Sequence, residues 1–254
     1  IFTLGSFGGG SLLAQVDRSS PLLLSTQKEE PQLLHTKLVV PDRGHRLTLS
    51  PSGDGMVRLL GLSIERDGPG ILVDSIGIRG RQAFTWLRWN EFLLRDMLST
   101  LNPDIIVLAY GTNEANDSDY TMERYSEDLR AVLRKMKSVH PNESCILVGP
   151  SDRGREESKK HFSVWERTQL VAEVQRNIAP EFGCAFWDWQ QATGGVGSMI
   201  AWNHTSPKLS SPDLIHFTPQ GYQVSADLFV QALDDVALHY QRKPNKKRFR
   251  WNQK

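Results

Sequence analysis

From about residue 82 onward, the chain alternates amphipathic stretches with short, continuous apolar runs. Apolar residues recur at helical spacing in "AFTWLRWNEFLLRDMLSTL" (83–101), "YTMERYSEDLRAVLRKMKSVH" (120–140), "SVWERTQLVAEVQRNIAPEF" (163–182) and "TPQGYQVSADLFVQALDDVALHY" (218–240). Buried strands are predicted at "DIIVLAY" (104–110), "SCILVGP" (144–150) and "CAFWDW" (184–189), and another at the start of "ILVDSIGIRGRQ" (71–82). This order predicts an α/β fold in three layers, a parallel sheet with helices on both faces.

Residues 1–76 have a different pattern. Short apolar stretches, separated by clusters of Gly, Pro, Asp and Ser, occur in "SLLAQVD" (11–17), "LLHTKLVV" (33–40), "HRLTLS" (45–50) and "MVRLLGLSIER" (56–66). Short strands at close spacing with turn signals predict a β-sandwich or jelly roll. We therefore predict a β-sandwich at 1–70, an α/β domain at 71–242 and a basic tail at 243–254.

Composition excludes several classes of protein. The net charge of +1 gives no overall attraction to nucleic acid, and the basic residues of 241–254 are interpreted as a solvated tail. No apolar run approaches the roughly 18–20 residues that a transmembrane helix needs. The chain begins with Ile1 rather than Met, so a signal peptide could precede it.

Two cysteines, Cys145 and Cys184, lie in the apolar runs "CILVG" and "CAFW". Such cysteines are most often plain core residues, and a disulfide between neighbouring strands is the alternative. Their spacing supplies too few ligands for a metal site, and we expect neither a metal nor an organic cofactor. These two residues alone do not show whether the protein occupies an oxidising or a reducing compartment.

Polar or Gly-rich loops follow the predicted strands, at the sheet edge where ligands of parallel sheets bind. In "SPDLIHFTPQGY" (211–222), His216 could take a proton from a hydroxyl nucleophile while Asp213 orients the imidazole. The Asn113 amide and the Gly80 backbone N–H are suitable donors for an oxyanion. Each motif alone has an ordinary explanation as a cap, a turn or a core residue. Their joint occurrence at the expected edge favours catalysis.

These motifs resemble those of the SGNH (GDSL-like) hydrolase family over about residues 71–240. The third sequence block of that family corresponds to "GTNE", Gly111 to Glu114, with Glu where the family has Asp, and the fifth block corresponds to "DLIH". "GIRGRQA" resembles the second block, with Gly80 rather than Gly77 in the oxyanion role. The resemblance implies that Asp213 and His216 belong to a catalytic triad and that Gly80 and Asn113 stabilise the oxyanion.

The first block of the family, Gly-Asp-Ser, is absent from the sequence. Ser6 in "TLGSFGG" and Ser75 in "VDSIG" are imperfect substitutes. The better explanation is a resemblance to bacterial peptidoglycan O-acetylesterases that carry a β-sandwich, similar to a carbohydrate-binding module, between the first and second blocks. We therefore expect the nucleophile to lie upstream of these residues, and the chain as given to be impaired or inactive.

The predicted function is that of a serine esterase that removes O-acetyl groups from a carbohydrate such as peptidoglycan, in the cell envelope or outside the cell. The alternatives are a non-catalytic carbohydrate-binding relative and a lipase or thioesterase of the same fold. Among Trp86, Trp89, Trp187, Trp189 and Trp202, the first four fit core packing at least as well as sugar stacking. Trp202, in the loop region before the Asp213–His216 pair, is the predicted substrate contact. The expected partner is an acetylated carbohydrate, and no nucleic acid.

Overall fold

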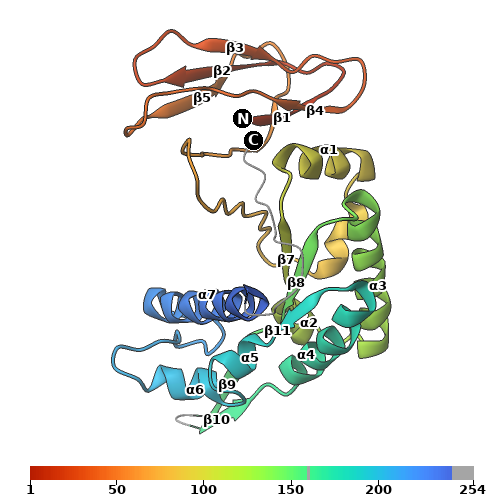
Figure 1. Cartoon of the computed structure of the whole chain (residues 1–254), viewed down its shortest axis with the longest axis vertical. Coiled ribbons are helices and arrows are strands. Elements are labelled where there is room, and N and C mark those ends of the chain that lie inside the picture. The colour runs from red at the N-terminus through yellow and green to blue at the C-terminus, as the bar shows by residue number, and fades with distance from the viewer. Residues whose placement is uncertain (159–160, 242–254) are drawn as a thin grey trace. The chain divides into compact units, whose positions relative to one another are not determined.

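The computed structural model describes residues 1–158 and 161–241, which form two compact units (Figure 1). The first unit comprises Ile1–Arg79 and Trp89–Asn102, and the second comprises Gly80–Arg88 and the chain from Pro103 onward. The predicted basic tail at 243–254 lies outside the described residues. The predicted domain boundaries at 70 and 242 stay predictions.

The first unit contains two three-stranded antiparallel sheets. One has the order β4 (Gln32–His35), β1 (Phe2–Gly5), β6 (Arg58–Gly61), and the other has the order β3 (Leu22–Ser25), β2 (Ser11–Val16), β5 (Leu47–Pro51). A buried cluster joins Ile1 to Leu12 and Ala14, with Leu24, Leu38, Leu49 and Val57 packed against it. Each of the four stretches between residues 11 and 66 in which the sequence predicts a strand contains one, and the β-sandwich itself stays a prediction.

The stretch 83–101, predicted as one helix, is two. The 3-10 helix η1 (Ala83–Arg88) is followed by the α-helix α1 (Glu91–Leu101), which belongs to the first unit. The break occurs because the Asn90 side chain accepts a hydrogen bond from the Leu93 backbone N–H at 3.0 Å, and so caps a new helix. Helix α1 ends at Asn102, in the left-handed conformation before Pro103.

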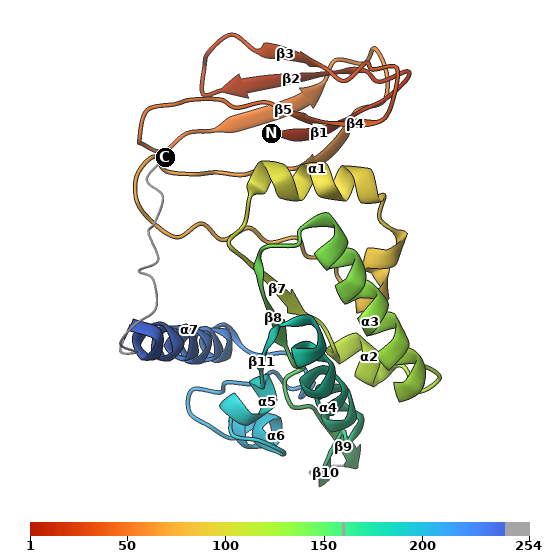
Figure 2. The same ribbon diagram turned by 45° about the vertical axis from the view of Figure 1, so that its right-hand side comes forward.

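The second unit is built on a parallel sheet with the order β11 (Ala185–Trp187), β8 (Ser144–Val148), β7 (Ile105–Ala109). Helices α3 (Met122–Val139) and α4 (Arg167–Ile178) lie on one side of this sheet, and α7 (Pro219–Gln241) lies on the other (Figures 1 and 2). The α/β fold with a parallel sheet is therefore confirmed. Among the described helices, none is long and apolar enough to cross a bilayer.

The strand register shows which face of this sheet α7 covers. Trp187 pairs with Val148, which pairs with Ala109, so alternate residues Val107 and Ile105 lie on the same face as Trp187. The Trp187 ring lies 4.8 Å from that of Phe229 in α7. At the β7 end the same face is open, because Ile105 and Val107 are 47% and 44% exposed. Within the described chain, β7 pairs with β8 alone, so its other edge is free.

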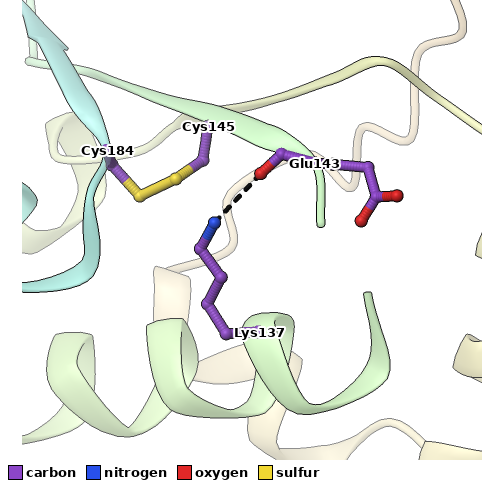
Figure 3. Close-up of a disulfide and its surroundings, with 4 residues drawn as sticks. All are labelled: Lys137, Glu143, Cys145 and Cys184. Atoms are coloured by element: carbon purple, nitrogen blue, oxygen red, sulfur yellow. Dashed lines mark hydrogen bonds between the residues drawn. A yellow bond between two sulfur atoms is a disulfide. The ribbon is translucent and has the colours of Figure 1, made fainter. Parts of the chain in front are cut away.

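Cys145 and Cys184 form a disulfide, so their interpretation as two plain core cysteines is wrong (Figure 3). The register gives the reason. Ala185 pairs with Ile146, which places the preceding residue, Cys184, beside Cys145 on the adjacent strand with a Cα–Cα distance of 4.7 Å. Figure 3 also shows Lys137 of α3 donating a hydrogen bond to the Glu143 carbonyl oxygen, at 3.0 Å, just before β8.

The segment 71–76 is not the strand that its sequence predicts. Ile71 and Val73 are 91% and 86% exposed, and no strand of the described residues pairs with them. A strand needs a neighbour to satisfy its backbone hydrogen bonds, and this segment has none.

Several short elements were not predicted. They are α2 (Thr112–Asn116), the hairpin of β9 (Gly154–Ser158) and β10 (His161–Val164), α5 (Trp189–Ala192) and α6 (Ser198–Asn203). The 3-10 helix η2 (Ala179–Phe182) is the end of the helix predicted at 163–182. The hairpin replaces a predicted loop and the start of a predicted helix, which begins instead at Arg167. Its first strand, "GREES", carries no apolar alternation that could have revealed it.

Candidate active site

Asp213 and His216 form a hydrogen-bonded pair in the turn before α7. Asp213 Oδ2 lies 2.7 Å from His216 Nδ1, and Oδ1 accepts the backbone N–H groups of Ile215 and His216, each at 3.0 Å. Burial raises the pKa of the Asp213 carboxyl, but the hydrogen bonds from the His216 side chain and from the two backbone groups outweigh it and lower the pKa. The carboxylate is thereby kept ionised, and its oxygens both fold the turn and orient the ring.

The other ring nitrogen of His216, Nε2, has no hydrogen-bond partner in the part of the chain that the structure describes. The His216 side chain is 67% exposed. An imidazole with Nδ1 held by a carboxylate and Nε2 free is arranged to accept a proton at Nε2.

Leu214 holds this turn in a strained backbone conformation. Its φ of 56° is in the left-handed region, although its side chain is 2% exposed. The Leu214 carbonyl accepts the Gly154 backbone N–H at 3.0 Å, and a Cβ on Gly154 would come within 3.3 Å of the Leu214 Cβ. Packing against the start of β9 therefore fixes the loop that carries Asp213 and His216.

Gly80 and Asn113 line one cavity, of about 450 Å³. Gly80 has a φ of +71°, and no acceptor for its N–H exists among residues 1–158 and 161–241. The Asn113 Nδ2 donates to the Arg81 carbonyl at 3.0 Å, which ties the two loops together. The structure thus brings the two predicted oxyanion donors into one cavity, as it brings Asp213 and His216 into one turn.

Glu114, the residue that departs from the family motif, links the segment that follows Gly80 to the turn that carries Asn113. Its side chain is fully buried, with Oε1 accepting the Ala83 N–H at 2.7 Å and Oε2 accepting the Gly111 N–H at 2.9 Å. Burial raises the pKa of this carboxyl, although the backbone hydrogen bonds oppose the shift. Sequence reasoning assigned Glu114 no role, because its buried partner Ala83 is distant in the chain.

We expect Glu114→Gln to lower the free energy of unfolding by about 1–3 kcal/mol, because one buried backbone N–H would face an amide NH₂ instead of an oxygen. Because the folded-state pKa is raised, the native carboxyl favours folding most below its unfolded-state pKa, and this contribution falls as pH rises through the folded-state pKa. Urea unfolding from about pH 4 to 7 should therefore show a pH dependence that the variant lacks. The exposed helical change Glu127→Gln is the control, and identical pH profiles for wild type and Glu114→Gln would contradict the assignment.

Gly111 stands where no other residue fits. Its φ is +130°, and a Cβ there would lie 2.7 Å from Cδ of the Pro150 ring. We expect Gly111→Ala to lower the free energy of unfolding by about 2–4 kcal/mol through backbone strain and overpacking. Chemical denaturation measures this, with Gly44→Ala, at an open surface position, as the control. A loss no larger than that of the control would refute the tight fit.

Arg153 interacts with Asn116, which lines the cavity of Gly80 and Asn113, and with the charge of Asp213. Its Nη1 donates to Asn116 Oδ1 in α2 at 2.9 Å, and its guanidinium lies 4.8 Å from the centroid of the Trp165 ring. Burial lowers the pKa of Arg153, while the charge of Asp213 acts in the opposite direction. Sequence analysis did not single out Arg153, although its position in a polar loop after a buried strand was a usable signal.

Trp202 lies next to the turn that carries Asp213 and His216, and it belongs to an aromatic cluster. Its ring centroid is 5.3 Å from that of Phe217, on which Trp189 also stacks. The Trp202 carbonyl accepts the Leu209 N–H at 3.0 Å, so the residue also holds the segment leading to Asp213. Its side chain is half-buried. Contact with substrate stays a prediction.

The remaining site questions concern metals and the two substitute serines. No group of three or more His, Cys, Asp or Glu side chains that could hold a metal ion occurs in the described ranges. Ser6 and Ser75 both belong to the first unit, whereas Asp213 and His216 belong to the second.

The chain belongs to the GDSL-like lipase/acylhydrolase family, whose model matches residues 48–224. No curated protein matches the sequence.

Two solved structures are among those similar to the chain. A peptidoglycan O-acetylesterase is 24% identical with a TM-score of 0.72, over 92% of this chain and 64% of that chain. The chain therefore spans somewhat less than two thirds of the length of that enzyme. An acetyl-xylooligosaccharide esterase from Geobacillus is 22% identical with a TM-score of 0.47, over 64% of this chain and 72% of that one.

Proposed function

We propose that the chain is part of an SGNH serine esterase that removes O-acetyl groups from a carbohydrate, and that the nucleophile comes from a segment outside these 254 residues. The observation that carries the proposal is His216, whose Nδ1 is held by Asp213, whose Nε2 has no hydrogen-bond partner among the described residues, and whose side chain is exposed. A histidine in this state serves as a general base for a hydroxyl group brought to Nε2.

The reaction follows from this arrangement. A serine hydroxyl attacks the acetyl carbonyl carbon as His216 Nε2 takes its proton, and the resulting oxyanion is stabilised by Gly80 N–H and the Asn113 amide. The sugar hydroxyl leaves with the proton from His216. Water, deprotonated by the same nitrogen, then attacks the acetyl-enzyme and releases acetate. Asp213 stabilises the imidazolium at both steps.

Two apolar surfaces support a missing strand as the source of the serine. The free edge of β7 carries unpaired backbone groups beside the exposed Ile105 and Val107. The apolar segment 71–76 likewise has no strand partner within the described residues. A strand added at the free edge of β7 would pair with the backbone groups of β7. A helix after that strand could then cover the exposed side chains of Ile105 and Val107.

The lining of the cavity at Gly80 and Asn113 favours a small acyl group over a long one. Arg81, Gln82, Asp117 and Ser118 surround the two donors, and Gln82 Nε2 donates to Asp117 Oδ2 at 3.1 Å. A long acyl chain needs an apolar channel, which this polar wall does not supply. The similar fold of a peptidoglycan O-acetylesterase supports an acetylated carbohydrate as the substrate.

The disulfide supports a location in the cell envelope or outside the cell. Cys145 and Cys184 are both used in it. Disulfides persist in oxidising compartments and are rare in the cytosol.

The experiment compares the present chain with a version extended by a Gly-Asp-Ser-bearing strand and helix. We expect the extended protein to be labelled by a fluorophosphonate and to hydrolyse p-nitrophenyl acetate much faster than the octanoate, and the present chain to do neither. Release of acetate from acetylated peptidoglycan or xylan then identifies the sugar. Strong labelling of the present chain at Ser6, at Ser75, or at Ser118 in the cavity would overturn the assignment of the nucleophile.

A non-catalytic carbohydrate-binding protein is the second candidate, favoured by the absence of Gly-Asp-Ser from the sequence. Binding of acetylated glycan by the extended protein, without release of acetate, would establish it.

A further inference from the structure

The first unit contains a cavity of about 560 Å³ between residues 16–19 and residues 37–45, here called the basic pocket. Four basic side chains line it, those of Arg18, Lys37, Arg43 and His45, together with the single carboxylate Asp17. Its volume is in the range typical of small-molecule sites.

A network centred on Asp17 shapes the pocket. Asp17 has a φ of 52°, and its carboxylate accepts the Arg46 N–H at 2.9 Å, His45 Nδ1 at 2.8 Å and Arg43 Nη2 at 3.2 Å. The Asp17 backbone N–H also donates to the Arg46 carbonyl, at 2.7 Å. The carboxylate of Asp17, the one acidic group that lines the pocket, is thus already engaged by Arg43, His45 and Arg46.

The arrangement around His45 favours its protonated form. Its Nδ1 faces the Asp17 carboxylate, and its Nε2 faces the Pro41 carbonyl oxygen at 2.8 Å. Because both partners are acceptors, both ring nitrogens donate, which requires the imidazolium form. The hydrogen bond to Pro41 and then the one to Asp17 raise the pKa of His45 accordingly.

Arg18 and Lys37 are exposed and have neither a hydrogen-bond nor an ion-pair partner among the described residues. Arg43 and His45 both pair with Asp17, the one carboxylate of the pocket, so Arg18 and Lys37 add uncompensated positive charge and spare donors. Such a cluster attracts an anion and can hydrogen-bond it.

The other wall is apolar and is formed by Leu38, Val39, Val40 and Pro41. Val39 is 85% exposed, whereas Leu38 packs against the core of the unit. A ligand that fits both walls has an apolar face and a carboxylate on the same small molecule. None of the lining residues is Trp, Tyr or Phe, so the pocket offers no aromatic ring for a nucleobase to stack on.

We propose that the basic pocket binds a carboxylate-bearing sugar, with the C–H face of the ring against Val39 and the carboxylate at Arg18 and Lys37. This is a second site, separate in sequence from the residues of the proposed esterase. Its role is to retain an acidic glycan on the protein, whether or not the chain hydrolyses esters.

Binding can be measured on the present chain by two-dimensional NMR, from the amide shifts of residues 16–19 and 37–45. N-acetylmuramic acid and N-acetylglucosamine are the matched probes, because they differ by the lactyl carboxylate. We expect the first to shift these amides saturably, and the second and free D-lactate to bind at least about tenfold more weakly. Equal binding of N-acetylglucosamine or of D-lactate would overturn the proposal.

D-glucuronate distinguishes the two sources of the carboxylate. If it binds as well as N-acetylmuramate, the pocket accepts sugar acids in general, and if it does not, the pocket selects the lactyl ether. Either result supports the proposal, and no binding of either sugar acid refutes it.

The double variant Arg18→Gln/Lys37→Gln should weaken N-acetylmuramate binding by about tenfold, since each exposed charge contact contributes modestly. Arg58→Gln, which removes one exposed positive charge from β6 outside the pocket, is the control and should bind as wild type does. Unchanged melting temperatures would show that both variants fold. Undiminished affinity of the double variant would rule out the two cations as the carboxylate site. Because no turnover is involved, failure of the esterase proposal would leave this measurement unaffected.

Discussion

In a form of the protein that carries the nucleophile, His216→Asn is expected to lower kcat by about ten-thousandfold or more, with little change in KM. Asparagine cannot take a proton from the serine or return it to the leaving sugar, so both chemical steps lose their general base and acid. Substrate binding uses other groups and is retained. Steady-state hydrolysis of p-nitrophenyl acetate measures the effect.

Asp213→Asn should reduce kcat by about the same order, since the amide cannot stabilise the imidazolium. The two changes together should cost hardly more than His216→Asn alone, because residues that act as one unit are not additive. His204→Asn is the matched control. His204 is exposed and caps the C-terminal end of α6, and its Nδ1 donates a hydrogen bond to the Ile200 carbonyl oxygen at 2.8 Å. A loss below about tenfold for His216→Asn would exclude it as the general base.

The double change Cys145→Ser/Cys184→Ser is expected to lower the free energy of unfolding by about 4 kcal/mol, the loop-closure estimate for a disulfide of this span. The cysteines are 39 residues apart, and they join β8 to the three-residue edge strand β11. Without the bond, the unfolded chain gains conformational freedom, and β11 depends on a few backbone hydrogen bonds.

Urea unfolding of wild type and variant, each with and without dithiothreitol, tests this. Reductant should destabilise the wild type to about the level of the variant and leave the variant unchanged. A wild type that is indifferent to reductant, and as stable as the variant, would contradict a bond between these cysteines.

The parallel sheet could be predicted from sequence because its strands are continuous apolar runs between amphipathic helices. Ile105–Ala109 and Ser144–Val148 fall within predicted strands, and α3 and α7 begin and end close to their predicted limits. The pairing of Asp213 with His216 could also be anticipated, because the two residues are three positions apart in one turn. Periodicity and short spacing are local properties of a sequence.

What the sequence did not reveal depends on contacts between distant segments. Glu114 meets Ala83 across 31 positions, and Cys145 meets Cys184 only because the register of β8 and β11 places them side by side. The segment 71–76 has strand-like composition, yet it forms no strand without a neighbour. At Asn90 the signal that was missed is local instead. The apolar spacing of 83–101 predicts one helix, but Asn90 caps the start of α1 and so divides this stretch into two helices.

The free edge of β7 has a consequence for how activity would be acquired. A strand that pairs there binds the folded chain and not the unfolded one, so it would stabilise the fold by mass action, increasingly as its concentration rises. If that strand carries the serine, the protein gains its nucleophile and its stability in one step. Hydrolytic activity and resistance to unfolding would then rise together as the strand-bearing segment is added. The concentration at which each effect is half-complete would be set by the affinity of that strand for β7.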